Sequence, residues 1–444
     1  MRQGHAADAV REVLRRLYAL GPGRMNYSRE RLARVLASAG DPQLAAAVVL
    51  VGGTNGKGRL VTALSAALSR RYRTGAFIKP HLKSIRERWR IGDRDVDAAS
   101  FTQATEQALA LIESSGEQLS FFEANVLIGA LLFRAAGCEI VVWEVGLGGQ
   151  HDACNLTEPF LSVLTNVQYD HQALLGETLS QIAADKAHIV RASRPLLLGP
   201  PRAGWEDAYA EYAPVVRSVC AKLGATLIEV PLLADPPSWA QHSSLPGDTL
   251  ALLSAALPHL AQAGFPLADS DTEQGLATLR YRGRMQYTTL RGHPVLLDAA
   301  HNPDSLRWLV RELQSQGAGA RYPIVFGCQA SRDPAVQLAE LKPVCEALVP
   351  IEVPVLRPCP LARIIEAATA LNIAVSLPAG FAPNAVPQDY DIGHVTELDP
   401  PDNRTRWIEC VEHALSLGTS ARPTVICGSI YNLGEILRVF ETES

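Results

Sequence analysis

The chain has 444 residues, more than a single compact core usually accommodates, so we expect two domains. Hydrophobic residues make up 47% of the composition and charged residues 20%, which excludes a disordered or fibrous chain. The 41 basic and 46 acidic residues give a net charge of −5, and this balance argues against nucleic acid or a membrane surface as a partner. Any phosphate site must therefore be local.

The 8 cysteines are scattered, with no CxxC pair and no zinc-like spacing, and they are typical of thiols in a reducing compartment. The N-terminus is charged, and no apolar run approaches the roughly 18 residues that would span a bilayer. We therefore expect a cytoplasmic protein, acting as a monomer.

The predicted elements begin with a helix, because Val10, Leu14 and Leu17 share one face at helical spacing. The apolar run 46–51 then predicts a strand buried on both faces. It is followed by a glycine-rich loop, 52–58, and by a helix with leucines every four residues, at 60, 64 and 68. Strand, loop and helix together form the first half of a βα unit.

Further apolar runs indicate an α/β fold. Strands are expected at 140–145, 161–167 and 195–198, and a helix at 124–133. A second set of strands is expected at 294–297, 324–326, 348–353 and 425–427. This alternation predicts mostly parallel sheets with helices on both sides, and we place a domain boundary near Gln286.

The loop has the sequence GGTNGKG and lies between a strand and a helix. Glycines in that position allow backbone N–H groups to converge on a phosphate, and the helix N-terminus adds a favourable dipole. Lys57 would then bridge the outer phosphates. A loop of this kind can also be a simple turn, and it is the strand–loop–helix context that favours nucleotide binding.

Several other blocks follow in order along the chain. They are Phe122-Glu123, Glu144-Val145-Gly146-Leu147-Gly148-Gly149, Asp152-Ala153 with Asn155, Asp170-His171, Leu175-Gly176-Glu177-Thr178-Leu179, Asp185-Lys186-Ala187, Arg284, Asp298-Ala299-Ala300-His301-Asn302-Pro303, Phe326-Gly327 and Gly428-Ser429-Ile430-Tyr431. Together with the glycine loop, this series resembles the folylpolyglutamate synthase/dihydrofolate synthase family of the Mur-ligase superfamily.

The resemblance implies a P-loop ATPase-like, Mur-ligase-type ATP-binding domain over residues 1–285 and a smaller Rossmann-like domain over 286–444. It implies an ATP-dependent carboxylate–amine ligase that uses Mg²⁺ and forms an amide through an acyl phosphate. The expected substrates are a small-molecule carboxylate acceptor, such as dihydropteroate or a folate, and glutamate as the amino acid. Such chemistry depends mainly on charge neutralisation and positioning.

The resemblance also implies individual roles. Lys57 would stabilise charge on the transferred phosphoryl group. Glu144 and His171 would bind magnesium, and Lys186 would do so as a carbamate. ATP would contact Gly53, Thr54, Asn55, Gly56, Lys57, Gly58, Arg59, Arg284, Asp298, His301 and Asn302. The structural alternatives are a buried ion-paired Glu144, a core His171, a surface Lys186 and capping roles for Asp298 and His301.

The chain departs from the family's pattern at the expected metal site. Arg59 replaces the Ser or Thr that follows GKG, and Lys79 replaces the serine of SPHL. Two cations near Glu144 would repel a divalent ion, since at an effective dielectric near 20 even a pair of unit charges 4 Å apart interacts by roughly 4 kcal/mol. The cations could replace one magnesium, the metal could keep fewer protein ligands, catalysis could be lost, or both side chains could turn to solvent.

Other departures concern the nucleotide and the acceptor, because Gln150, His188 and Ala299 replace an arginine and two glycines of the family's pattern. Two further functions therefore stay open beside the folate ligase. One is a Mur-like ligase with a non-folate acceptor. The other is a catalytically silent, nucleotide-binding homologue that acts as a scaffold or a regulatory subunit.

Overall fold

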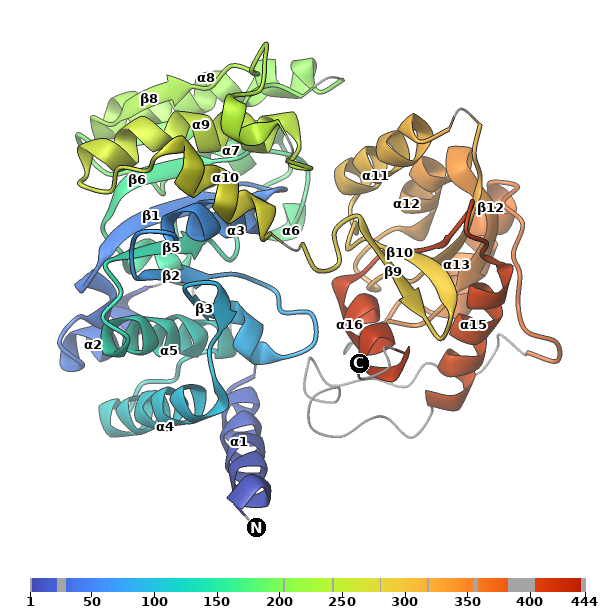
Figure 1. Ribbon diagram of the computed structural model, residues 1–444, viewed down its shortest axis with the longest axis horizontal. Helices are drawn as coiled ribbons and strands as arrows, with labels where there is room; N and C mark the ends of the chain where they lie inside the picture. Colours follow the sequence, from blue (N-terminus) through green and yellow to red (C-terminus); the bar gives the residue numbers. More distant parts are fainter. Residues whose placement is uncertain are drawn as a thin grey trace. The chain divides into compact units, whose positions relative to one another are not determined.

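The computed structural model describes residues 2–21, 29–202, 204–241, 243–279, 281–317, 319–353, 358–381 and 404–440. The chain divides into two compact units (Figure 1). The first comprises Met1–Lys79 and Arg86–Arg280, and the second comprises Pro80–Ile85 and Tyr281–Ser444. Both contain a mostly parallel sheet with helices, which confirms the predicted α/β class.

The first unit contains an eight-stranded sheet in the order β4-β3-β2-β5-β1-β6-β7-β8. Its strands are β1 (Ala47–Gly52), β2 (Thr74–Phe77), β3 (Trp89–Ile91), β4 (Arg94–Asp95), β5 (Ile140–Glu144), β6 (Pro159–Leu164), β7 (Pro195–Leu198) and β8 (Thr226–Glu229). The pairs from β2 to β8 are parallel, and only β3 and β4 run antiparallel to their neighbours.

The register of the central strands positions the site. Val51 of β1 pairs with Glu144 of β5, and Gly52 pairs with Leu164 of β6. All three strands therefore end at the same edge of the sheet, which is where open parallel sheets bind ligands. Because both faces of these strands are covered, their sequences are continuous apolar runs rather than alternating ones.

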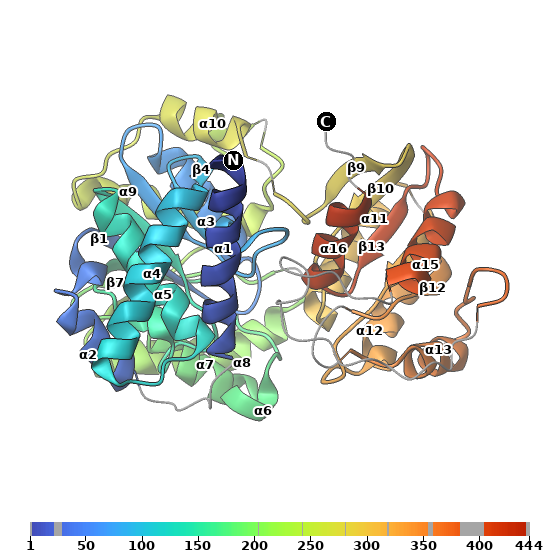
Figure 2. The same cartoon turned by 90° about the horizontal axis from the view of Figure 1, so that it is seen from below.

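The helices of this unit are α1 (Arg2–Ala19), α2 (Glu30–Ser38), α3 (Lys57–Leu68), α4 (Ala98–Ser115), α5 (Phe121–Ala135), α6 (Gln172–Leu175), α7 (Leu179–Ala187), α8 (Glu206–Leu223), α9 (Gly247–Gln262) and α10 (Asp269–Ala277). α5 packs its Phe133 edge-on against Trp143 of β5, with ring centroids 5.4 Å apart. The opening helix α1 lies beside α4 and α5, where Tyr18 stacks on Phe121 at 4.9 Å (Figure 2).

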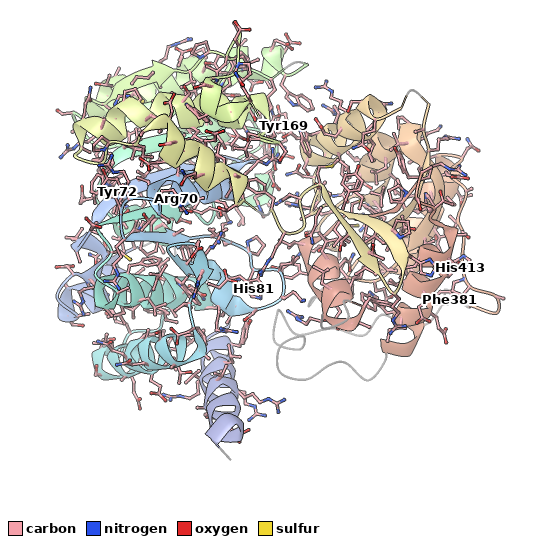
Figure 3. The ribbon with its side chains drawn as sticks, in the orientation of Figure 1. Arg70, Tyr72, His81, Tyr169, Phe381 and His413 are labelled. Atoms are coloured by element: carbon pink, nitrogen blue, oxygen red, sulfur yellow. The ribbon has the colours of Figure 1, made fainter. Side chains whose placement is uncertain are left out.

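Two side chains that follow α3 fasten its end to the α10 region. The Arg70 guanidinium donates to Oε1 of Gln274 at 3.0 Å, and the Tyr72 hydroxyl donates to the Pro266 carbonyl at 2.9 Å (Figure 3). A Cβ on Gly275 would lie 2.7 Å from the Cα of Ala67, so α10 packs directly on the backbone of α3. The C-terminal end of α3 is therefore held against α10.

The second unit contains a five-stranded sheet in the order β12-β11-β13-β10-β9, with only β9 antiparallel. Its elements are β9 (Gln286–Leu290), β10 (His293–Leu297), α11 (Pro303–Ser315), β11 (Tyr322–Phe326), α12 (Pro334–Leu341), β12 (Cys345–Pro350), α13 (Leu361–Ala370), α15 (Arg404–Leu417), β13 (Thr424–Cys427) and α16 (Ile430–Phe440). Leu296 packs in a core with residues of α11, α12 and α13, whereas Leu297 packs with residues of α15 and α16. Helices therefore cover both faces.

A short segment from the first half of the chain belongs to the second unit. Leu82 lies in the same apolar cluster as Leu297 and Leu433. The Arg438 guanidinium donates twice to the Lys83 carbonyl, at 3.0 and 2.5 Å. The chain thus passes from the first unit to the second between Lys79 and Pro80, and returns between Ile85 and Arg86. In the described part of the chain, no helix has the length and apolar character needed to cross a membrane.

Candidate nucleotide-phosphate site

The loop after β1 is fastened to the loop after β6. The backbone N–H groups of Thr54 and Asn55 donate to the main chain and the side chain of Asn166, at 2.9 and 3.0 Å. The Thr165 hydroxyl donates to the Asn55 carbonyl at 2.8 Å. Gly53 has φ +131°, and a Cβ there would lie 2.0 Å from the Thr165 hydroxyl oxygen. This position therefore requires glycine.

α3 begins directly after Gly56, whose φ of +85° is left-handed. No side chain caps this end of the helix, so its first N–H groups and its dipole point toward the loop. Lys57 is the first helical residue, and its ammonium donates to the carbonyls of Gly53 and Thr54 at 2.9 and 3.0 Å. An uncapped helix N-terminus with a lysine amine beside it fits the phosphates of a nucleotide.

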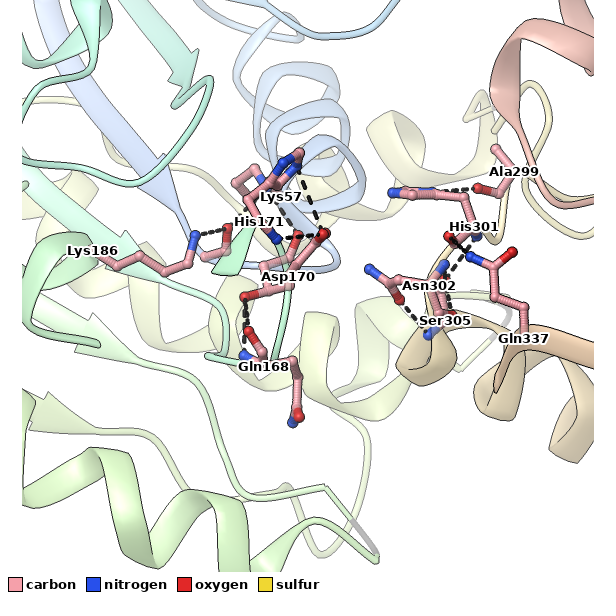
Figure 4. Close-up of polar contacts among 12 residues, drawn as sticks. Lys57, Gln168, Asp170, His171, Lys186, Ala299, His301, Asn302, Ser305 and Gln337 are labelled. Atoms are coloured by element: carbon pink, nitrogen blue, oxygen red, sulfur yellow. Dashed lines mark hydrogen bonds and ion pairs between the residues drawn. The ribbon is translucent and has the colours of Figure 1, made fainter. Parts of the chain in front are cut away.

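A second lysine reaches the same loop from α7. Lys186 is buried, and its ammonium donates to the Gly53 carbonyl at 3.2 Å, so this oxygen accepts from both lysines (Figure 4). Burial, followed by the charges of Lys79 and Lys186, lowers the pKa of Lys57 to about 7. Burial is also the main reason why the pKa of Lys186 falls to about 8. The loop thus concentrates positive charge where phosphate would bind.

Glu144 lies at the end of β5 and is buried. Its Oε2 accepts a hydrogen bond from the backbone N–H of Lys79 at 3.1 Å. The same oxygen lies 3.1 Å from the position of a Cβ on Gly58, so any side chain at residue 58 would crowd the carboxylate. The glycine after Lys57 is therefore needed to bring the start of α3 close to Glu144.

Asp170 and His171 follow β6 at the same edge of the sheet. Asp170 is buried, and its Oδ1 accepts from the His171 backbone N–H at 2.9 Å. The His171 Nε2 lies 3.8 Å from the same oxygen, and 47% of its side chain is exposed (Figure 4). With φ of +52°, His171 has a left-handed backbone that is unusual for a residue with a side chain. His171 is accordingly no core histidine.

The predicted ATP ligands of the second unit have local partners. Asp298 is buried, and its two carboxylate oxygens accept from the backbone N–H groups of Met285 and Ala300, at 2.9 and 2.8 Å. The His301 ring lies 2.9 Å from the Ala299 carbonyl oxygen. Asn302 caps α11 through the Ser305 N–H at 2.9 Å. These hydrogen bonds lie within the second unit, and the contacts of the three residues with ATP stay a prediction. Arg284 is half-buried, and its backbone N–H donates to the Tyr281 carbonyl.

Comparison with known proteins supplies relatives along the full length of the chain. No protein-family model matches it. The chain is 27% identical over 458 residues to the dihydrofolate synthase/folylpolyglutamate synthase of Escherichia coli, covering 99% of this chain and 97% of the relative. It is 27% identical to the folylpolyglutamate synthase of Lacticaseibacillus casei, covering 90% and 91%. The chain is thus similar, over nearly its whole length, to folylpolyglutamate and dihydrofolate synthases.

Solved structures of this synthase family share the fold. A Mycobacterium tuberculosis folylpolyglutamate synthase complexed with ADP matches with a TM-score of 0.79 at 19% identity, covering 99% of both chains. A bifunctional synthase of Yersinia pestis, complexed with AMPPNP and a Mn ion, matches with a TM-score of 0.76 at 24% identity, covering 97% of both chains. These matches establish the two-unit α/β architecture.

The two cations that distinguish this chain from the family's pattern lie in different surroundings. Lys79 acts electrostatically on Lys57, Lys186 and the buried Asp152. Arg59 instead acts on Asp248 of α9. Both residues are half-buried, so neither extends freely into solvent. Lys79 therefore belongs to the lysine cluster at the phosphate loop, and Arg59 to a separate group of charges.

Four residues beside the loop, Thr165, Asn166, Arg202 and Asp248, were not predicted from the sequence. Thr165 and Asn166 could have been found, because they follow a predicted strand at the sheet edge where the phosphate loop also lies. Arg202 and Asp248 carry no comparable signal, since 46 residues separate them along the chain and only the tertiary fold brings them together.

Proposed function

We propose that this chain is an ATP-dependent ligase that activates a carboxylate as an acyl phosphate and joins it to the amine of glutamate, with dihydropteroate or a folate as the acceptor. The observation that carries the proposal is the convergence of two lysines, the half-buried Lys57 and the buried Lys186, on one carbonyl of an uncapped phosphate loop. Similarity to folylpolyglutamate and dihydrofolate synthases along the length of the chain supports the same chemistry. The first unit would be the ATP-binding domain, and the second the C-terminal domain of the family.

The reaction requires charge neutralisation at the phosphates. The acceptor carboxylate attacks the terminal phosphorus of ATP, and ADP leaves. The glutamate amine then attacks the acyl carbon, phosphate leaves with the C–O bond electrons, and the amine gives up its proton. The Lys57 ammonium would leave the Gly53 and Thr54 carbonyls to bind phosphate oxygens, because a full negative charge attracts it more strongly than a neutral carbonyl does.

Glu144 and His171 would hold Mg²⁺. Among the described residues, no group of three or more His, Cys, Asp or Glu side chains could hold a metal by itself. Mg²⁺ fits nonetheless, because it is usually held by one or two carboxylates together with waters and substrate phosphates. The ion would neutralise phosphate charge. Lys186 would contribute as a carbamate, since a pKa near 8 makes its neutral amine accessible to carbon dioxide.

We further propose that the protein acts on small molecules as a cytoplasmic monomer. All 8 cysteines are free and buried, which agrees with a reducing compartment. The predicted contacts of Arg284, Asp298, His301 and Asn302 with ATP stay a prediction.

A phosphate-release assay tests the proposed function. The purified chain receives ATP and Mg²⁺, with a panel of pterin and folate acids, in the presence and absence of glutamate. We expect phosphate release that requires both the acid and glutamate, and its abolition by Lys57→Ala. ATP binding without any acid-dependent phosphate release would instead favour the silent homologue. Release with an acid outside the folate class would point to the non-folate ligase.

A further inference from the structure

Two arginines and one carboxylate form a charged group beside the phosphate loop, all within the first unit. Arg202 lies in the loop after β7, Asp248 in the first turn of α9, and Arg59 in the first turn of α3. β7 pairs in parallel with β6, so the loop that carries Arg202 leaves the sheet at the same edge as the phosphate loop.

Asp248 holds Arg202 by two contacts. The Arg202 Nε donates to Asp248 Oδ2 at 2.6 Å, and Nη2 lies 2.5 Å from the same oxygen. Both side chains are largely buried, with 17% and 12% exposed. The other oxygen, Oδ1, accepts from the backbone N–H of Thr249 at 2.7 Å. The carboxylate is thus fixed at both oxygens, and the plane of the guanidinium is fixed with it.

The guanidinium is directed at the phosphate loop. Arg202 Nη2 lies 3.5 Å from the position that a Cβ on Gly56 would take, and among the described residues, chain neighbours aside, no other group comes within 4 Å of that position. Gly56 precedes the uncapped N-terminus of α3. The arginine therefore stands beside the backbone N–H groups that would bind phosphate.

The Asp248 carboxylate stays ionised. Burial favours its neutral form, but the charges of Arg202 and Arg59, together with the hydrogen bonds from Arg202 and Thr249, outweigh burial and lower its pKa. An ionised carboxylate holds a guanidinium more firmly than a neutral carboxyl group would. Arg59 stands where the family's pattern has a hydroxyl.

We propose that Arg202 is a ligand of the nucleotide phosphates, oriented by Asp248. The inference rests on the proposed function, because it concerns the same phosphate loop. A planar guanidinium suits this role, since its N–H groups can donate to two phosphate oxygens at once.

The binding of ATP and adenosine, measured by calorimetry with and without Mg²⁺, tests this assignment. Arg202→Gln should weaken ATP binding about tenfold or more, as expected for a lost hydrogen bond to a charged group, and leave adenosine unaffected. Arg202→Lys should retain part of the affinity. Arg217→Gln is the matched control, because it removes an exposed arginine paired with Glu229 in the same unit and should bind ATP normally.

The variant Asp248→Asn distinguishes the orienting effect of Asp248 on Arg202 from the effect of its negative charge on ATP. If Asp248 affected ATP only through its charge, removing that negative charge would tighten ATP binding. If Asp248 instead orients Arg202, the variant should bind ATP more weakly, although the net charge of the site has become more positive.

A second measurement needs no substitution. Phenylglyoxal should modify Arg202 in the parent chain, and ATP, but not adenosine, should slow that modification.

The outcomes can be distinguished. Weaker ATP binding in both variants, together with protection of Arg202 by ATP, supports the proposal. ATP affinity in Arg202→Gln equal to that of the control, no protection of Arg202, or tighter binding in Asp248→Asn overturns it and leaves the proposed function standing. A parent chain that binds no ATP at all overturns both.

Discussion

Lys57 is a half-buried cation whose charge depends on what binds to it. Its pKa falls from 10.5 to about 7, chiefly through burial and then through Lys79 and Lys186. Between about pH 7 and 10.5 the unfolded chain therefore carries more protons at this residue than the folded one, and its contribution to folding stability rises with pH across that window. A bound phosphate would raise the pKa again.

ATP binding should therefore take up protons above about pH 7, and the affinity should fall as pH rises. Calorimetry in two buffers that differ in ionisation enthalpy measures this uptake. Lys186, with a pKa of about 8, titrates nearby, so the decisive comparison is with Lys57→Met. The variant should take up fewer protons than the parent. Equal uptake in the two proteins would mean that Lys57 does not bind the phosphates.

We expect Lys79, but not Arg59, to determine how strongly ATP binding depends on Mg²⁺. Lys79 adds positive charge beside Glu144 and the two lysines, whereas the charge of Arg59 is directed at Asp248. Lys79→Ser should therefore strengthen Mg²⁺ binding and make ATP binding more metal-dependent. Arg59→Ser should change the metal dependence little. Titration of Mg²⁺ against ATP affinity measures both, and identical curves for Lys79→Ser and the parent would refute the assignment.

The residues of the phosphate loop were predictable because glycine and lysine serve recognisable chemistry at a strand–helix junction. The separation of Lys79 from Arg59 was not predictable, since both replace hydroxyl residues of one expected site. Their different surroundings come from α9, which presents Asp248 to Arg59 only in the folded chain. The direction of a long side chain depends on such tertiary partners.

At the scale of elements, the strand–loop–helix unit depends on Gly53. A methyl group there would meet Thr165, and the φ of +131° disfavours any side chain. Gly53→Ala should lower the free energy of unfolding by at least about 2 kcal/mol, since overpacking and backbone strain each cost roughly 1–3 kcal/mol. Gly92→Ala is the control, because Gly92 also has positive φ but nothing lies within 4 Å. Urea unfolding with equal losses in both variants would contradict the role of Thr165.

Buried parallel strands were predictable from sequence, whereas very short or half-exposed strands were not. The runs at 46–51, 140–145 and 195–198 correspond to β1, β5 and β7, because strands covered on both faces are apolar throughout. β4 and β9 were missed, since β4 has only two residues and β9 is exposed on alternate positions. Short or half-exposed strands resemble loops in composition.

In the molecule as a whole, the chain passes from one unit to the other directly after Lys79. Lys79 closes the first unit, and the next residue, Pro80, belongs to the second. No periodicity in the sequence indicates this exchange, because the segment Pro80–Ile85 is too short to form a repeating pattern. Lys79 is therefore bonded directly to the segment Pro80–Ile85, whose Lys83 carbonyl accepts hydrogen bonds from Arg438.

Leu82→Ala should destabilise the second unit selectively. Leu82 is buried with Leu297 and Leu433, and such a truncation typically costs about 2–5 kcal/mol. Hydrogen exchange should become faster in β13 and α16 while β1 and α3 keep their protection, because only the second unit loses packing. Faster exchange confined to the first unit would show that the segment does not belong where the structure places it.

If this chain converts its acceptor into an acyl phosphate, one oxygen atom of the acceptor carboxylate must end in inorganic phosphate, and isotopic labelling can follow that atom. The enzyme would receive an acceptor whose carboxylate carries heavy oxygen, together with ATP, Mg²⁺ and glutamate. Because the carboxylate oxygen that attacks ATP leaves with the phosphate, each turnover should transfer one labelled oxygen into inorganic phosphate. Amide formation with unlabelled phosphate, or phosphate release that does not depend on the acceptor, would contradict the account.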